Sequence, residues 1–289
     1  VVLGDRFEVM AICQAAMLGC IPIAHIHGGE TTEGLIDEAV RHSITKMSHL
    51  HFTATDAYRN RVIQLGEIPQ KVFNVGAPGI DSIKSLKLID RNALTGSLGF
   101  DVTGPFIVVT YHPVTLNKDG ALIALENLLS VLATYPDLNF IITYPNADTH
   151  NQGLITALEA FKKEHCDQVL LVRSLGQLRY LSLLKHCEAV IGNSSSGLIE
   201  APTFLKPTVN IGNRQGGRIC GGTVINSDED VPSITKALIK ALSKDFREKC
   251  LSEHNPYGSG GSSERILDII KSISLDDLVM KKFYDVKPL

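Results

Sequence analysis

The stretch Pro22-Ile-Ala-His-Ile-His-Gly-Gly-Glu30 decides the fold class of this chain. It is an apolar run that ends in two histidines and two glycines, and acidic residues and a helical pattern follow it. Residues 25–42 hold three histidines, four carboxylates and an arginine, which is too many ionisable groups for a plain connection between a strand and a helix. In α/β proteins the carboxyl ends of strands hold ligands and catalytic groups. The stretch therefore predicts an α/β protein with half of an active site at this point.

The pattern on either side of this stretch alternates short apolar segments with helical segments of ten to fifteen residues, which is typical of a parallel sheet covered by helices on both faces. In the first part of the chain we expect strands at 1–4, 21–26, 50–53 and 72–75, and helices at 7–18, 35–47 and 56–65. The helix at 7–18 is apolar nearly all round, so we expect it to be buried.

A polar, glycine-containing stretch at residues 88–105 interrupts this pattern, which then restarts. We therefore predict two Rossmann-like domains, at residues 1–100 and 101–268. By analogy with two-domain folds of this type, the charged tail at 269–289 is expected to cross back to the first domain. In the second domain we expect strands at 106–111, 139–144, 168–172, 189–191 and 208–211, and helices at 121–133, 153–163, 178–186, 197–203, 232–243 and 262–272.

Length and composition exclude several classes of protein. A chain of 289 residues with 44% hydrophobic and 20% charged residues can form two packed cores. The net charge of -3 gives no reason to expect a nucleic acid or a membrane as partner, and no apolar run reaches the roughly 20 residues of a membrane-spanning helix. The six cysteines form no C-x-x-C pair, so we expect reduced thiols in a cytoplasmic protein.

The chain opens with Val-Val-Leu-Gly-Asp, a strand that leads at once into a turn with polar residues. We expect from this start that the N-terminal part of the first domain is missing. Asp5 could cap the following helix, whereas Arg6 is suited to bind a phosphate oxygen.

In the opening stretch, Gly28-Gly29 allows close approach of a ligand to the backbone. In a helix that starts near residue 35, Asp37 with Arg41 and Glu38 with His42 are i,i+4 pairs, which could also serve only to stabilise a surface helix. His25, His27 and Glu30 have the composition of a metal site, but H-x-H beside a carboxylate is frequent by chance, and we predict no metal.

Polar residues also follow two strands of the predicted second domain. His112, in Tyr111-His-Pro-Val-Thr115, could bind a diphosphate or act in acid-base chemistry, and it could also be merely exposed at a strand end. Asn146, in Tyr144-Pro-Asn-Ala-Asp148, occupies a similar position in a less specific motif.

The strongest local motif is Gly192-Asn-Ser-Ser-Ser-Gly197, between a strand and a predicted helix. Backbone N–H groups and the hydroxyls of Ser194 and Ser195 predict an anion site at a helix N-terminus. Glu200 would face the ligand or its ribose, and Arg214 adds a cation after the next strand. The lysine and spacing of a Walker P-loop are absent.

Together these motifs resemble those of the hydrolysing UDP-N-acetylglucosamine 2-epimerases, in the wider UDP-GlcNAc 2-epimerase superfamily. The residues that carry the resemblance are Gly4-Asp-Arg6, His25-Ile-His-Gly-Gly-Glu30, Asp37, Arg41-His-Ser-Ile-Thr-Lys46, His112-Pro-Val-Thr115, Gly192-Asn-Ser-Ser195, Glu200 and Arg214-Gln215. The resemblance covers residues 1 to about 272 and extends to Lys281-Lys-Phe283 in the tail.

The resemblance implies a GT-B-like pair of domains with a UDP-sugar in the cleft between them, no cofactor, and a homo-oligomer (a dimer or tetramer). It also implies two-stage chemistry, in which UDP is eliminated to give a 2-acetamidoglucal and water then adds to give the free 2-epimer. By position, the candidate catalytic residues are Asp5, His27, Glu30, Asp37 and His112. The candidate UDP-sugar contacts are Arg6, Arg41, His42, Asn146, Ser194, Ser195, Glu200 and Arg214.

Three questions stay open at this point. The substrate implied first is UDP-GlcNAc, converted to N-acetylmannosamine and UDP for sialic acid synthesis, and the alternative is UDP-N,N′-diacetylbacillosamine or a GDP-linked sugar for legionaminic acid synthesis. Some relatives have glutamate where this chain has His27, so the acid-base role could belong to His27 or to Glu30. A GT-B glycosyltransferase is an alternative enzyme class, and a nucleotide-sugar sensor is a non-enzymatic one.

Overall fold

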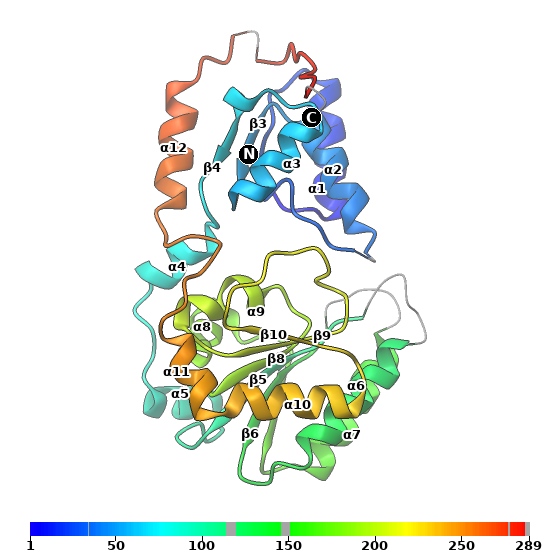
Figure 1. Ribbon diagram of the computed structural model, residues 1–289, viewed down its shortest axis with the longest axis vertical. Coiled ribbons are helices and arrows are strands. Elements are labelled where there is room, and N and C mark those ends of the chain that lie inside the picture. The colour runs from blue at the N-terminus through cyan, green and yellow to red at the C-terminus, as the bar shows by residue number, and fades with distance from the viewer. Residues whose placement is uncertain (34, 114–119, 146–150, 277, 287–289) are drawn as a thin grey trace. The chain divides into compact units, whose positions relative to one another are not determined.

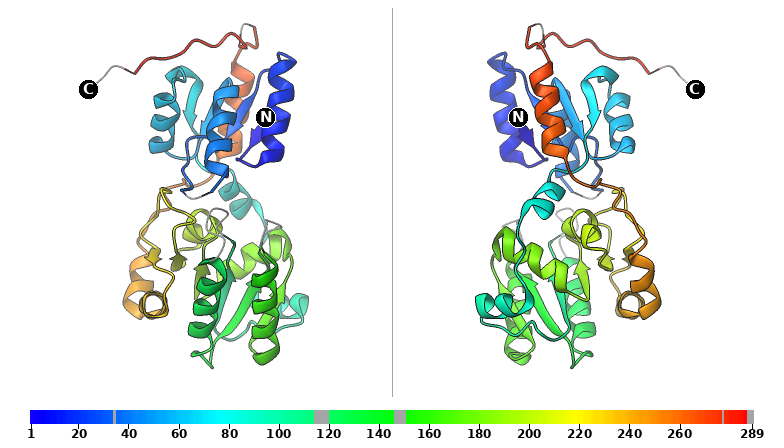
Figure 2. Two further views of the ribbon diagram at one scale, coloured as in Figure 1. Left: turned by 90° about the vertical axis from the view of Figure 1, so that its right-hand side faces the viewer. Right: turned by 90° about the vertical axis from the view of Figure 1, so that its left-hand side faces the viewer.

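A computed structural model describes residues 1–33, 35–113, 120–145, 151–276 and 278–286 of the chain. The chain forms two compact α/β units (Figures 1 and 2). Unit 1 consists of Val1–Lys84 together with Pro256–Leu289, and unit 2 consists of Ser85–Asn255. Each unit has its own parallel sheet, which agrees with the predicted fold class.

Unit 1 contains a four-stranded sheet in the order β1-β2-β3-β4. Its strands are β1 (Val2–Leu3), β2 (Ala24–Ile26), β3 (Leu50–Thr53) and β4 (Val72–Asn74), and its helices are α1 (Phe7–Leu18), α2 (Asp37–Met47), α3 (Asp56–Gln64), α4 (Gly79–Ser85), α12 (Ser262–Ser272) and the short 3₁₀ helix η1 (Pro69–Lys71). All neighbouring strands are parallel, so their carboxyl ends share one edge of the sheet. The turns that follow β1 and β2 are therefore brought side by side.

Successive side chains of β2 and β3 point to opposite faces of this sheet, as strand geometry requires. On one face, Ala24, Leu50 and Phe52 pack with Ile266 of α12, which lies beside the sheet in Figure 2. On the other face, His25 contacts Thr45 of α2. The sheet is thus covered by α12 on one side and by α2 on the other.

Helix α1 has the predicted ends but is not buried as predicted. Cys13 is fully buried in a cluster with Ile23 and Ile44, whereas Phe7 and Leu18 are 61% and 82% exposed. The helix packs along α2 on one side only, and an apolar composition leads to burial only where a neighbouring element covers each side. The expectation that α1 is buried is therefore wrong for most of its surface.

The chain from Pro256 onward belongs to unit 1. The prediction had placed residues up to 268 in the second domain and only the tail at 269–289 against the first. We call residues 278–284 the C-terminal segment. Leu278 joins the apolar cluster under α12, and the Lys281 ammonium donates to the backbone carbonyls of Lys46 (2.9 Å) and Ser48 (2.6 Å) and pairs with Glu67 (2.8 Å). These contacts attach the segment to the end of α2.

Unit 2 contains a six-stranded parallel sheet in the order β10-β9-β8-β5-β6-β7. Its strands are β5 (Phe106–Thr110), β6 (Asn139–Thr143), β7 (Val169–Val172), β8 (Ala189–Gly192), β9 (Thr208–Ile211) and β10 (Val224–Ser227). The order reverses between β5 and β8, which is the topological switch point of a doubly wound fold. Ligands bind in such folds outside the carboxyl ends of the strands at this point.

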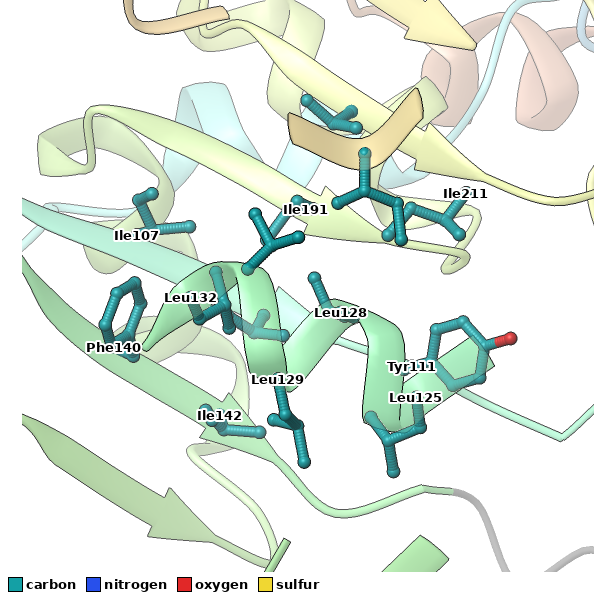
Figure 3. Close-up of a cluster of buried hydrophobic side chains, with 14 of the residues drawn as sticks. Ile107, Tyr111, Leu125, Leu128, Leu129, Leu132, Phe140, Ile142, Ile191 and Ile211 are labelled. Carbon is teal, nitrogen blue, oxygen red and sulfur yellow. The ribbon is translucent and has the colours of Figure 1, made fainter. Parts of the chain in front are cut away.

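The helices of unit 2 are α5 (Arg91–Leu98), α6 (Gly120–Leu132), α7 (Gln152–Glu164), α8 (Gly176–His186), α9 (Ser196–Ile199), α10 (Val231–Leu242) and α11 (Lys244–Cys250), with the 3₁₀ helix η2 (Ala201–Phe204). Figure 3 shows how the leucines of α6 pack on the sheet: Leu128 and Leu132 lie among Ile107, Phe140 and Ile191. The regular i,i+4 spacing of these leucines explains why the helix forms and which face it buries.

Two parts of unit 2 differ from the sequence-based expectation. Residues 88–105, predicted as the boundary between the domains, contain α5. The Asp90 carboxylate caps its first turn by accepting from the Ala93 amide (2.9 Å), and its Leu94 is buried. Strand β10 and helix α11 were not predicted. The boundary between the units consequently lies at Lys84 and Ser85 rather than near residue 100.

Among the described residues, no helix combines the length and the apolar character that crossing a membrane requires.

Candidate functional site

The turns after β1 and β2 converge on the side chain of Arg41, which is fully buried in α2. Its guanidinium donates to the Asp5 carboxylate (3.0 Å from Nε), to Glu38 (2.7 Å), to the Thr32 hydroxyl (2.8 Å) and to the backbone carbonyl of Glu30 (3.1 Å). Burial alone would lower the pKa of Arg41, but the adjacent Asp5, Glu30 and Glu38 carboxylates raise it. Arg41 therefore stays charged and joins three segments of the chain.

These contacts decide between the alternatives for Asp5 and Arg41. Asp5 is not a helix cap, because the residue at the N-cap of α1 is Arg6, and its carboxylate instead pairs with a residue 36 positions away. Arg41 was expected to contact the substrate, but its guanidinium is directed to these internal partners. We assign to Arg41 the role of positioning Asp5 and the turn at Glu30.

Glu38 and His42 form the predicted i,i+4 pair, with 3.0 Å between Oε1 and Nε2. The second oxygen of Glu38 accepts from the backbone amide of Thr32 (2.6 Å). Burial would raise the pKa of Glu38, but the hydrogen bonds from Thr32 and His42 and the charge of Arg41 lower it. Glu38 is thus held as a carboxylate that ties the loop before α2 to the helix.

His27 and Glu30 form a close pair, with 2.6 Å between Nδ1 and Oε1. Glu30 is 2% exposed, whereas the His27 side chain is 18% exposed, so the pair reaches the surface through the imidazole. The turn between them is tight: His27 has φ 68°, and at Gly29, with φ 79°, a Cβ atom would come within 2.3 Å of the Tyr58 carbonyl oxygen. Glycine at position 29 is required by this close approach.

Asp37 and Arg6 complete the polar groups near this edge. Asp37 is the first residue of α2 and is half-buried, in the helix position where a negative charge is stabilised. Arg6 is half exposed and pairs with Glu8 at 3.3 Å. Arg6 is therefore more accessible than Arg41.

His25 is a residue of this region that the sequence indicated only as a metal candidate. It is fully buried, its Nε2 lies 2.8 Å from the Gly4 carbonyl oxygen, and its Nδ1 lies 3.3 Å from the Thr45 hydroxyl. Burial lowers the pKa of His25 to about 4. Because a carbonyl only accepts, Nε2 carries the proton, and His25 supports the turn before Asp5 as a neutral donor.

In unit 2, the groups predicted to bind the nucleotide follow β5, β8 and β9 at the switch point. His112 is 7% exposed, and its pKa is lowered to about 3 by burial and by the positive charge of Arg214. Arg214 donates to the backbone carbonyl of Asn193 (3.1 Å). His112 is therefore neutral at physiological pH and is suited to hydrogen bonding rather than to donating a proton as a strong acid.

A pocket of about 420 Å³ opens beside these loops, and its polar lining includes Thr110, His112, Ser194, Ser196, Tyr180 and Glu200. The Tyr180 hydroxyl donates to Ser196 (2.7 Å), and the Ser196 hydroxyl donates to the Glu200 carboxylate. Burial raises the pKa of Glu200, although the bond from Ser196 opposes this. Tyr180 and Ser196 were not predicted as site residues, and they orient the predicted Glu200 carboxylate.

The loop after β8 approaches β5 closely. At Gly192, with φ 137°, a Cβ atom would meet the Thr110 carbonyl oxygen at 1.9 Å, so only glycine fits. The helix predicted after this loop is a single α turn, α9, followed by the 3₁₀ helix η2, because Pro202 cannot continue the α-helical hydrogen bonds. Ser195 lies at the N-cap of α9 but makes no side-chain cap bond, and such a short helix contributes little dipole to an anion site.

Two further expectations concern the candidate site as a whole. Asn146 lies outside the described residues. Within the ranges that the structure describes, no three or more histidine, cysteine, aspartate or glutamate side chains are arranged to hold a metal ion.

The two parallel sheets, with charged groups at the carboxyl edge of one and a polar pocket at the carboxyl edge of the other, define a two-unit α/β protein of the doubly wound, GT-B-like class. Residues 1–271 match the family model described as UDP-N-acetylglucosamine 2-epimerase. The chain belongs to this family, as its motifs predicted.

Curated relatives support the same assignment. The polysialic acid biosynthesis protein P7 of Escherichia coli is 40% identical over 99% of this chain and 73% of its own length. The GDP/UDP-N,N'-diacetylbacillosamine 2-epimerase (hydrolyzing) of Campylobacter jejuni is 36% identical over 99% of this chain and 74% of its own. The UDP-N,N'-diacetylbacillosamine 2-epimerase (hydrolyzing) of Legionella pneumophila is 36% identical over 97% and 72%.

Solved structures confirm the fold. The UDP-GlcNAc 2-epimerase of Neisseria meningitidis, solved bound to UDP-GlcNAc, superposes with a TM-score of 0.80 at 21% identity, over 94% of this chain and 76% of that one. The Methanocaldococcus jannaschii enzyme, solved with UDP-GlcNAc and UDP, gives 0.76 at 21% identity, over 93% and 74%.

Proposed function

We propose that this protein is a hydrolysing 2-epimerase that converts a UDP-linked N-acetylated sugar and water into UDP and the free 2-epimer. The observation that carries the proposal is the set of acid-base groups at the carboxyl edge of unit 1: Asp5, Asp37 and the His27–Glu30 pair, in a chain whose relatives are named as hydrolysing 2-epimerases. A protein that only binds a sugar nucleotide has no need of so many carboxylates at one edge.

The proposed reaction has two stages. In the first, a base removes the proton from C2 while the bond from C1 to the diphosphate oxygen breaks, which forms the 2-acetamidoglucal and releases UDP. In the second, water adds its oxygen to C1 and a proton is delivered to the opposite face of C2. Each stage needs a positioned base or acid, and such groups contribute about 10²–10⁴-fold to the rate.

We assign the acid-base work to Asp5, Asp37 and the His27–Glu30 pair. Because His27 Nδ1 and Glu30 Oε1 are 2.6 Å apart, the two side chains are hydrogen-bonded and are placed to act together. We propose a joint role for His27 and Glu30, in which the more exposed imidazole meets the substrate.

For the nucleotide we propose the pocket beside the loops after β5 and β8, together with Ser195 and Arg214 of the adjoining loops. Arg214 and the neutral His112 are suited to the diphosphate oxygens, with Ser194 and Ser195 as hydroxyl donors, and Glu200 is suited to accept from the ribose hydroxyls. Arg6, which is half exposed, and His42 are proposed as further substrate contacts. Asn146 remains a proposed contact on the basis of sequence alone.

UDP-GlcNAc is the proposed substrate, which would give N-acetylmannosamine. The second candidate is UDP-N,N′-diacetylbacillosamine or its GDP-linked form, because the names of two relatives at 36% identity specify these sugars. The proposal includes a cytoplasmic location. It also includes a dimer or tetramer, and sedimentation velocity would test this oligomeric state.

The deciding experiment incubates the protein with each sugar nucleotide in D₂O and follows the products by proton NMR. A free 2-epimer with deuterium at C2 and an equimolar amount of UDP is the expected outcome. Transfer of the sugar to an acceptor without deuterium at C2 would favour a GT-B glycosyltransferase. An equilibrium of UDP-linked epimers, or no reaction with any of the sugars, would contradict the proposal.

A further inference from the structure

Asn193 joins the ends of β5 and β8 where the two strands separate. The last register pair of these strands is Thr110 with Gly192, and the Asn193 amide still donates to the Thr110 carbonyl (3.0 Å). Beyond this pair, which lies at the switch point, the hydrogen-bond ladder between β5 and β8 ends. The backbone amide and carbonyl of His112 therefore lose their partners in the sheet.

The side chain of Asn193 takes the place of a neighbouring strand for these two backbone groups. Its Oδ1 accepts from the His112 backbone amide (2.7 Å), and its Nδ2 donates to the His112 backbone carbonyl (2.9 Å). Asn193 is fully buried and His112 nearly so, which means that water could not easily serve these groups. An asparagine side chain presents its donor and its acceptor on two separate atoms, as these two bonds require.

The backbone of Asn193 holds the third loop. Its carbonyl oxygen accepts from Arg214 Nη1 (3.1 Å) and from Nε2 of the buried Gln215 (2.8 Å), both of which follow β9. A single residue thus connects the loops after β5, β8 and β9. These loops carry His112, Ser194 and Arg214.

We propose that Asn193 is a positioning residue that sets the affinity for the diphosphate half of the substrate. The inference rests on the proposed function, which assigns the diphosphate to His112, Ser194 and Arg214. When all three are fixed in advance, binding does not have to order them, and less binding energy is lost to conformational entropy. Asn193 itself is directed into the protein and acts through these groups rather than on the ligand.

A positioning role makes a prediction that general destabilisation does not. Uridine shares the base and ribose of UDP but has no phosphate, so its binding should depend little on the three phosphate-side groups. In Asn193→Ala, the Kd for UDP, measured by calorimetry, is expected to rise at least tenfold. The Kd for uridine, measured by ligand-observed NMR, is expected to change less than threefold.

Asn210→Ala is the matched control. Asn210 is a buried asparagine of the same sheet, on β9, and its Nδ2 donates to the Asn226 side chain (2.9 Å). Its truncation removes a buried amide of the same size, and the Kd for UDP is expected to stay within threefold of the wild type. Gln215→Met serves if Asn193→Ala does not fold, because it leaves the Asn193 side chain intact and removes the Gln215 donor to the Asn193 carbonyl, together with the oxygen that accepts from Arg218 (3.1 Å). A threefold to tenfold rise in the UDP Kd is expected.

The outcomes separate this inference from the proposed reaction. Equal losses of UDP and uridine affinity in Asn193→Ala, or an unchanged UDP Kd in it or in Gln215→Met, would overturn the positioning role. UDP binding by the wild type without turnover of any sugar nucleotide would refute the reaction and leave the positioning role standing. A wild-type protein that does not bind UDP would overturn both.

Discussion

The carboxyl edges of the two sheets carry different kinds of polar group. At the edge of unit 1, the buried guanidinium of Arg41 pairs with Asp5 and Glu38, and Glu38 is held ionised. At the edge of unit 2, burial lowers the pKa of His112 to about 3 and raises that of Glu200, so both shifts favour the neutral form. The first edge maintains charges in fixed positions, whereas at the second edge the imidazole is neutral and burial disfavours the charge of the carboxyl group.

This difference follows from what each edge is proposed to do. Proton transfer at a carbon atom requires acid and base groups that are held in position against that atom. Recognition of a nucleotide that already carries charge requires directed hydrogen bonds with little loss of entropy. The same strand-end geometry therefore serves both tasks, and the residue types that follow each strand decide between them.

The largest expected effect comes from removing a charge at the carboxyl edge of unit 1. Asp37→Asn keeps the shape of the side chain but removes a carboxylate from the first turn of α2. Turnover, followed by proton NMR, is expected to fall about 10²–10⁴-fold, as for loss of a general acid or base. The Kd for UDP, which belongs to the other edge, should change less than threefold; a loss of UDP binding equal to the loss of turnover would place Asp37 on the nucleotide instead.

The next effect concerns the attachment of the C-terminal segment to α2. In Lys281→Met, Glu67 loses a partner while it stays buried at 3% exposure. A hydrogen bond to a charged group contributes roughly 1.5–3 kcal/mol, so the free energy of unfolding in urea is expected to fall by about 2 kcal/mol at neutral pH. The adjacent exposed Lys282→Met is the control and should leave the midpoint unchanged.

The pH dependence of this loss has a definite sign. Burial would raise the pKa of Glu67, but hydrogen bonds from His51, Lys281 and Lys46 lower it from 4.5 to about 2. A lowered carboxyl pKa in the folded state stabilises the protein above pH 4.5, and this stabilisation is lost as the pH falls towards 2. The stability difference between wild type and Lys281→Met should therefore shrink over this range, and a difference that is constant down to pH 2 would contradict the assignment.

The smallest effect tests the neutral edge. Because the pKa of His112 is about 3, its imidazole does not titrate between pH 6 and 8. The test measures the Kd of UDP-GlcNAc, which lacks the titrating terminal phosphate of UDP, in the Asp37→Asn variant, in which turnover is strongly slowed. This Kd is expected to vary less than twofold across this range. Affinity that increases below pH 7 in this variant, but not after an added His112→Gln substitution, would show that His112 binds as a cation.

Much of the fold could be predicted because hydrophobic periodicity is a local property. The ends of α1, β3, β9 and α12 agree with the sequence pattern to the residue. Strand β10 was missed because Val224-Ile-Asn-Ser227 is short and follows a glycine-rich stretch, and α5 was missed because polar residues and Gly96 conceal its single buried leucine. The exposure of α1 depends on what covers it, which composition does not show.

The candidate site likewise contains residues that local motifs indicate and contacts that only the fold shows. Strand-end motifs indicated Asp5, His27, Glu30, His112 and Glu200, because polar residues after apolar strands can be recognised locally. The pairing of Asp5 with Arg41 depends on the neighbouring positions of β1 and β2 and on the packing of α2, so no local sequence pattern indicates it. The bonds of Asn193 to His112 connect residues 81 positions apart and depend on the strand order of the sheet.

The left-handed backbone of His27 limits how this position can change in evolution. A residue other than glycine at φ 68° stores about 1 kcal/mol or more of strain, and asparagine and glycine tolerate this conformation best, whereas β-branched residues do not. In a library randomised at position 27, glycine and asparagine should give the most stable proteins but lose the imidazole beside Glu30. Selection for stability and selection for turnover would therefore recover different residues at this position.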